Sequence, residues 1–106
     1  MGLKVNPPPF PDAAKIKGWA NVQADGTNDA SYNVTSVVRT GAGQYTVTWD
    51  TDFSSADYAA VVTAINDGEM LAQIDSQTAG TTLVEIRDGA GNFTDSEFNL
   101  IAIGSQ

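Results

Sequence analysis

The acidic side chains are the residues of this sequence that could do chemistry, because it contains neither histidine nor cysteine. A glycosidase needs two carboxyl groups held at a fixed separation across the scissile bond. Surface charge that keeps the domain in solution explains the acidic residues here without such a pair. The sequence therefore predicts a protein that is not an enzyme and has no catalytic residues. The acids considered lie in two groups: Asp50 and Asp52 flank one turn, and Glu85, Asp88, Asp95 and Glu97 bracket another.

Two loops collect oxygen atoms that a hard cation could use, residues 25–29 (Asp-Gly-Thr-Asn-Asp) and residues 88–92 (Asp-Gly-Ala-Gly-Asn). Calcium needs about six to eight oxygen ligands, and neither loop has the residue order of an EF-hand or its closing glutamate. Ordinary turns, in which an Asp or Asn side chain bonds to its own backbone, account for both loops. We expect no metal and no other cofactor.

Aromatic side chains that flank polar loops could stack on a sugar. Trp19, Phe53, Tyr58 and Phe93 are placed in this way. The alternative, that each aromatic belongs to the core or to an interface, stays open; Trp49, Tyr45 and Phe98 fit the core. The predicted ligand-binding residues are Asn28, Asp52, Phe53, Tyr58, Asn92 and Phe93.

The net charge of −8, from thirteen acidic and five basic residues, disfavours nucleic acid and anionic membrane surfaces as partners. No apolar run approaches the roughly 18–20 residues of a spanning helix, so we expect no membrane insertion. Residues 1–12 hold all four prolines and predict an extended lead-in from a preceding module. The alternative is a proline-rich ligand for an aromatic groove. Residues 13–106 are predicted to form one domain.

The strongest structural signal is a β-hairpin in residues 31–49. Tyr45, Val47 and Trp49 alternate with polar residues, which is the period of a half-buried strand. Residues 40–43 (Thr-Gly-Ala-Gly) predict a four-residue loop. That loop would pair Arg39 with Gln44, Val38 with Tyr45, and Val34 with Trp49.

Strand patterns also occupy residues 13–23, 58–65, 69–77, 81–88 and 93–103, whereas residues 24–30 are predicted to be a loop. About seven strands with turns every 8–12 residues are typical of an antiparallel sandwich or barrel, and we predict an all-β sandwich. Apolar residues are also predicted on the strand faces opposite the core, where a monomeric sheet would be polar. Another copy of the chain is the economical cover. The predicted interface residues are Trp19, Val37, Leu83, Ile101 and Ile103.

Four segments in order, from residue 14 to residue 104, carry a family resemblance: AKIKGWANV, SYNVTSVVRTGAGQYTVTWDTDF, ADYAAVV and SEFNLIAIG. This chain resembles the C-terminal β-domains of tailed-bacteriophage tail fibres, and is more distantly similar to small trimeric or hexameric lectin sandwiches. Two features depart from the fibre pattern. Gly18 precedes Trp19, and residues 69–78 have no counterpart.

The resemblance implies a homotrimeric module at or near the end of a virion fibre, reached by an extended segment. Its implied role is attachment to the host surface, through a glycan or an outer-membrane protein. The alternative is a trimerisation or capping module without a receptor of its own. Loops of such domains vary most, so the resemblance does not identify a receptor.

Overall fold

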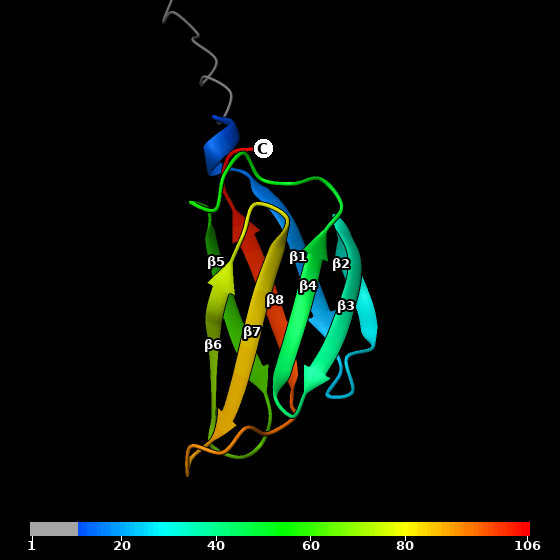
Figure 1. The fold of residues 1–106 in the computed structure, drawn as a ribbon, viewed down its shortest axis with the longest axis vertical. Coiled ribbons are helices and arrows are strands. Elements are labelled where there is room, and N and C mark those ends of the chain that lie inside the picture. The colour runs from blue at the N-terminus through cyan, green and yellow to red at the C-terminus, as the bar shows by residue number, and fades with distance from the viewer. Residues whose placement is uncertain (1–10) are drawn as a thin grey trace, which may run out of the picture.

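The computed structural model describes residues 11–106 as two four-stranded antiparallel sheets packed face to face (Figure 1). The strand order is β2-β1-β8-β5 in sheet A and β3-β4-β7-β6 in sheet B. The predicted all-β sandwich is thus confirmed. A 3₁₀ turn, η1 (Asp12–Ala14), precedes eight strands: β1 (Ile16–Val22), β2 (Asn28–Tyr32), β3 (Val34–Gly41), β4 (Gln44–Trp49), β5 (Ala59–Ile65), β6 (Met70–Gln77), β7 (Thr81–Asp88) and β8 (Glu97–Ile103).

The core lies between the sheets and follows the period-two alternation of the central strands. In β4 and β8 every second side chain is buried, because successive side chains point to opposite faces of a sheet. The aromatic rings of Tyr45 and Phe98 meet across the core with centroids 4.9 Å apart. The largest fully buried side chains are Trp49, Tyr45, Phe98, Ile86, Leu100, Val22, Val47 and Val84.

The structure has one strand more than the predicted seven. The predicted first strand of the hairpin is divided at Asn33, which has φ 61°. Asn tolerates this left-handed conformation better than most residues. Its side chain bonds to both polar groups of the Thr51 backbone, accepting from N–H at 2.7 Å and donating to C=O at 3.2 Å. The chain therefore turns a corner here, from β2 in sheet A to β3 in sheet B, and part of the predicted loop 24–30 belongs to β2.

The predicted register of the β3–β4 hairpin is correct at one end and wrong at the other. Val34 lies opposite Trp49 as predicted, but Arg39 lies opposite Tyr45 and Val38 opposite Thr46. The register shifts after Val34 and again after Arg39, and an extra residue of this kind turns the following side chains to the other face. The loop is only two residues long, since β3 ends at Gly41 and β4 begins at Gln44.

The two ends of the sandwich differ. Both ends of the described chain meet at one of them, the terminal pole, together with the loops 50–58 and 78–80 (Figure 1). Asp12 joins them, because its carboxylate binds the Lys17 ammonium at 2.9 Å and accepts from Gln106 N–H at 3.0 Å. Strict alternation from Trp19 would place Lys17 on the outer face, yet a bulge between Ile16 and Gly18 buries it. We call the opposite end, with the loops 23–27, 42–43, 66–69 and 89–96, the free pole.

The predicted lead-in, residues 1–12, lies outside the described residues except for Pro11 and Asp12. Within residues 11–106, no helix has the length and apolar character that a membrane span requires.

Candidate functional site

The outer face of sheet A carries the most distinctive surface of the molecule. Cross-strand pairing places Tyr32, Trp19, Ile101 and Val61 in one row across all four strands. In the neighbouring row, towards the terminal pole, Ile103 of β8 lies between Ile16 of β1 and Ala59 of β5. Large side chains in the two rows are between 37% (Ile103) and 65% (Val61) exposed. We call this surface the apolar face; its residues are Ile16, Trp19, Tyr32, Ala59, Val61, Ile101 and Ile103.

The apolar face covers about half of the outer surface of sheet A, since it holds two of the four outward residues of β8. The whole sheet face, four strands spaced by about 4.8 Å with seven residues rising by about 3.3 Å each, spans roughly 440 Å² in projection. A contiguous exposed apolar patch on a monomer is often an interaction site. The two rows contain no charged side chain, although the chain as a whole has a net charge of −8.

The outer face of sheet B is different. Thr46 and Thr48 of β4 pair with Leu83 and Thr81 of β7, and Gln44 pairs with Glu85. Val38 and Leu71 are 52% and 59% exposed there, but they are apart from each other, with Thr46 opposite Val38 and Arg87 opposite Leu71. The prediction of apolar outward faces therefore holds for one sheet, and the predicted interface residue Leu83 lies half-buried on the other, more polar sheet.

The interface prediction for Val37 is wrong. Val37 lies opposite Val47 and packs against the core, because the register shift after Val34 turns it inward. Trp19, Ile101 and Ile103 do lie together on the apolar face. Ile16, Tyr32 and Val61 were not among the predicted interface residues, although the adjacent Val61 and Val62 indicate a strand that is apolar on both faces.

The structure divides the predicted ligand-binding residues between the two poles. Near the terminal pole, Phe53 and Tyr58 are 3% and 7% exposed and stack on each other with centroids 3.9 Å apart. The Tyr58 hydroxyl donates to backbone carbonyls at 2.7–2.8 Å inside the sandwich. Phe53 packs in the core, and Tyr58 is mostly buried but also lines the pocket at this pole, so neither ring is presented as an open platform for a sugar. Asp52 is exposed beside Gly80 in the same region.

The remaining predicted ligand residues lie in the free-pole loops or beside them. Asn28, at the start of β2, donates from its amide to Ser31 Oγ at 2.8 Å. Phe93 is 37% exposed, and the Arg87 guanidinium stacks over its ring at 3.9 Å from the centroid. Asn92 donates from its backbone N–H to the Asp88 carboxylate at 3.0 Å. Phe93 is thus the one loop aromatic of the predicted set that a ligand could reach.

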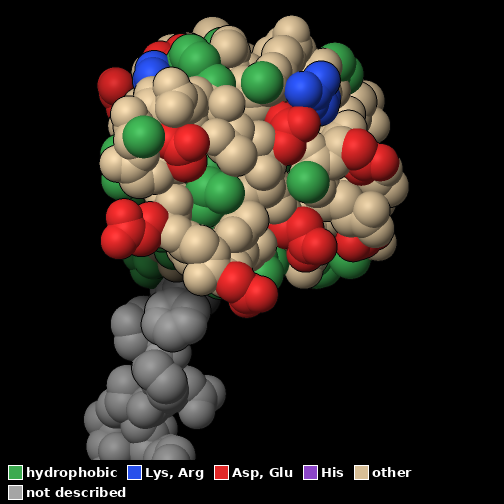
Figure 2. Space-filling view, turned by 90° about the horizontal axis from the view of Figure 1, so that it is seen from below, with side chains coloured by type: hydrophobic (Ala, Val, Ile, Leu, Met, Phe, Trp, Pro, Cys, Tyr) green, Lys and Arg blue, Asp and Glu red, His purple; other side chains and the backbone are tan. Residues whose placement is uncertain are grey.

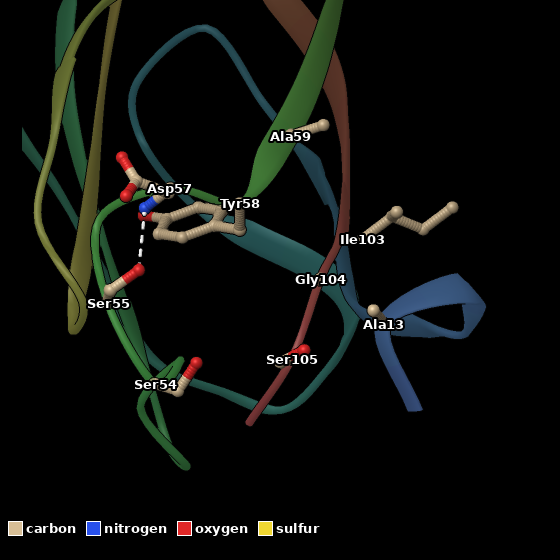
Figure 3. A pocket seen from close by; sticks show the side chains of 9 residues that line it. All are labelled: Ala13, Ser54, Ser55, Asp57, Tyr58, Ala59, Ile103, Gly104 and Ser105. Atoms are coloured by element: carbon tan, nitrogen blue, oxygen red, sulfur yellow. Dashed lines mark hydrogen bonds between the residues drawn. The ribbon is translucent and has the colours of Figure 1, made fainter. Parts of the chain in front are cut away.

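A pocket of about 350 Å³ opens at the terminal pole (Figure 3). Ser54 and Ser55 lie on one side of it, and Ile103 of the apolar face lies across from them. The Ser55 hydroxyl accepts a hydrogen bond from Asp57 N–H at 3.1 Å. Since the chain has no histidine or cysteine, the pocket contains none of the usual partners that activate a serine.

Carboxylates elsewhere are engaged in structural contacts. Glu85 accepts from the Gln73 amide at 3.2 Å and pairs with Arg87 at 3.4 Å. The negative charge of Glu85 raises the pKa of the neighbouring Asp75 carboxyl above its ordinary value. No group of three or more possible metal-ligating side chains occurs among residues 11–106.

Asp95 is the acceptor that ties the free-pole loops together. Its carboxylate binds Arg39 Nε at 2.9 Å, Gly43 N–H at 2.8 Å and the Tyr45 hydroxyl at 3.3 Å. The Arg39 guanidinium and then the Gly43 N–H hold the pKa of the Asp95 carboxyl below its ordinary value. An Asp carboxyl in the unfolded chain has a pKa of about 3.9, and above that pH the charge of Asp95 contributes its full stabilisation to the fold. The stabilisation is lost as the pH falls through the lower pKa that Asp95 has in the folded protein.

We expect Asp95→Asn to lower the free energy of unfolding by about 1 kcal/mol at pH 7, a small value because the pair is partly exposed to solvent. The difference from wild type should be constant between about pH 7 and pH 5 and should shrink below about pH 4. Urea denaturation at several pH values measures it. A difference that grows on acidification would contradict this assignment.

A scan against protein-family models and searches of the curated proteins and of the solved structures found no match to this chain.

Proposed function

We propose that this chain is a non-enzymatic domain that assembles into a homotrimer through the apolar face and forms part of a virion tail fibre. The observation that carries the proposal is that face: two rows of apolar side chains across four strands, without a charge, on one sheet only. Burying such side chains contributes roughly 25 cal/mol for each Å² removed from water. The resemblance to tail-fibre domains supplies the biological setting.

The position of the chain ends supports a fibre. If three copies turn sheet A towards a common axis along the strands, their terminal poles lie at one end and their free poles at the other. The three lead-ins then enter at the same end, and sheet B, with its polar outer face, remains in solvent.

In this arrangement the free pole points towards the host and presents Asn92 and the accessible Phe93. Figure 2 shows this pole, with acidic side chains scattered over it among uncharged ones. We propose that it contacts a host-surface glycan or outer-membrane protein when the virion is outside the cell.

A trimerisation or capping module without a receptor is the second candidate function. Two of the predicted sugar platforms, Phe53 and Tyr58, are buried, which favours this candidate. Binding of a fluorescent fusion of the full chain to bacterial cells distinguishes the two. Loss of binding in Phe93→Ala, with the assembly intact, supports attachment, whereas no binding by wild type to any tested host supports the capping role.

Ile101→Lys tests the assembly. The lysine would place an ammonium in the middle of the apolar row, and we expect the subunit dissociation constant to rise at least about thirtyfold, as for an interface hot spot. Multi-angle light scattering over a range of concentrations measures it. The matched control is Val38→Lys, at a valine on sheet B that is 52% exposed against 45% for Ile101, and this variant should assemble like wild type. A wild-type protein that stays monomeric at high micromolar concentration overturns the proposed assembly.

A further inference from the structure

A polar row lies next to the apolar face on sheet A. Asn21 of β1 lies directly opposite Asn99 of β8, and Asn99 lies opposite Thr63 of β5. This row is two residues, or about 6.6 Å, from the row of Trp19 and Ile101. A depression of about 250 Å³ lies between the two rows, lined by Trp19, Ala20, Asn21, Asn99, Leu100 and Ile101.

Among residues 11–106 the side-chain amides of Asn21 and Asn99 differ from several others. Asn28 bonds to Ser31 and Asn33 bonds to Thr51. Within residues 11–106, Asn21 and Asn99 make no side-chain hydrogen bond of this kind. An amide that a neighbouring molecule covers needs a hydrogen-bond partner in that molecule, because burying it away from water without a hydrogen bond costs free energy.

We propose that copies associate about an axis that runs along the strands, so that Asn21 and Asn99 of neighbouring copies hydrogen-bond to one another and set the register. This inference rests on the proposed assembly through the apolar face and identifies the second copy as the partner of the amide row. Buried polar pairs of this type select one register and one number of subunits at some cost in stability.

Two observations favour this direction. The sheet face, at roughly 440 Å² in projection, is smaller than the roughly 800 Å² that each partner gives to a standard interface. A ring, in which each copy meets two neighbours, adds the flanking edges to the contact. The row beyond the amides pairs Glu97 with Ile65, so the amide row is the last uncharged row before the free pole.

The competing arrangement is a face-to-face pair about a two-fold axis that lies across the strands. That axis turns the second copy end for end. The Asn21 and Asn99 row of the second copy then lies beyond the Ile103 row of the first copy, away from the amides of the first copy. The two arrangements differ in whether residue 99 of one copy meets residue 99 of another.

Asn99→Asp and Asn99→Lys test this difference. Asn99 is exposed in the single chain, so neither change should disturb the fold, and circular dichroism checks that. If the axis runs along the strands, residue 99 of each copy meets residue 99 of its neighbours, so each variant brings like charges together. We expect the subunit dissociation constant of each variant to rise at least about thirtyfold. An equimolar mixture should restore assembly in part, because a mixed trimer replaces two of its three like-charge contacts with opposite-charge contacts. Native mass spectrometry should then find both variants in each particle. The control is Asn66→Asp, which makes the same charge change in a free-pole loop.

The outcomes separate the two proposals. Variants that assemble like wild type overturn the axis direction while leaving the assembly itself intact. Wild type that remains monomeric overturns both. A monomer whose Asn21 and Asn99 amide signals shift on addition of N-acetylglucosamine assigns this face to a sugar and also overturns the inference.

Discussion

Trp49→Ala is expected to lower the free energy of unfolding by about 3–5 kcal/mol, the usual cost of removing a large buried ring. Trp49 is 2% exposed, and its ring meets Phe53 edge-on with centroids 5.8 Å apart. Its indole N–H donates to Thr82 Oγ1 at 3.0 Å. The ring also occupies the space that a side chain at Gly18 would need, because a Cβ there would lie 2.4 Å from the indole. The cavity left by alanine cannot close easily, since both sheets border it.

Urea denaturation followed by far-UV circular dichroism measures this loss, at one fixed protein concentration because assembly would otherwise shift the midpoint. Trp49→Phe is the matched control. It keeps much of the ring volume but removes the hydrogen bond to Thr82, so we expect a loss of only about 1–2 kcal/mol. A loss below about 1 kcal/mol for Trp49→Ala would show that this ring is not the centre of the core.

Gly43→Ala is expected to cost about 3 kcal/mol or more. Gly43 closes the two-residue hairpin loop with φ 63°, and a Cβ there would lie 2.3 Å from the Ile86 carbonyl oxygen and 2.7 Å from Thr94 N. Both are backbone atoms, which cannot move aside as a side chain can. Ile86 N–H donates to Gly43 C=O at 2.7 Å, and Thr94 N–H donates to Ile86 C=O at 3.0 Å. The new methyl group would therefore break contacts that join the hairpin to β7 and to the loop before β8.

Gly91→Ala separates this clash from backbone strain. Gly91 also has a positive φ, 87°, but a Cβ there would have nothing within 4 Å. We expect this control to lose about 1 kcal/mol, the lower end of the cost of a strained backbone position. Thermal unfolding of the two variants gives the comparison. Equal losses would show that strain, rather than the backbone contact, determines the effect at Gly43.

A glycine inside a strand pattern is typical of a bulge or a close neighbour, and at Gly18 the structure has both. The β1–β8 register shifts between Ile16 and Gly18, and the Trp49 ring lies against Gly18. A glycine beside a tryptophan within a strand pattern was enough to predict this feature. It could not show that the bulge buries Lys17, because that depends on the backbone carbonyl of Gly104 at the other end of the chain.

Predictions that failed involve residues whose direction depends on other segments. Val37 turns inward because the β3–β4 ladder contains an extra residue, and no pattern in β3 alone marks that position. Phe53 and Tyr58 were predicted to be accessible because they flank polar loops. They are buried because the loop 50–58 folds back over the end of the sandwich, where Phe53 N–H donates to Ala79 C=O at 2.8 Å.

The alternation of side chains along each strand indicated, from the sequence alone, an all-β sandwich or barrel, and it identified Tyr45 and Trp49 of β4 as core residues. That information is local, since a strand has a period of two residues whatever its neighbours are. Only the tertiary structure decided which outward residues become neighbours. Trp19, Ile101, Val61 and Tyr32 come from four segments distant in the chain. Strand order and register bring them into one apolar row on sheet A, and they leave sheet B polar.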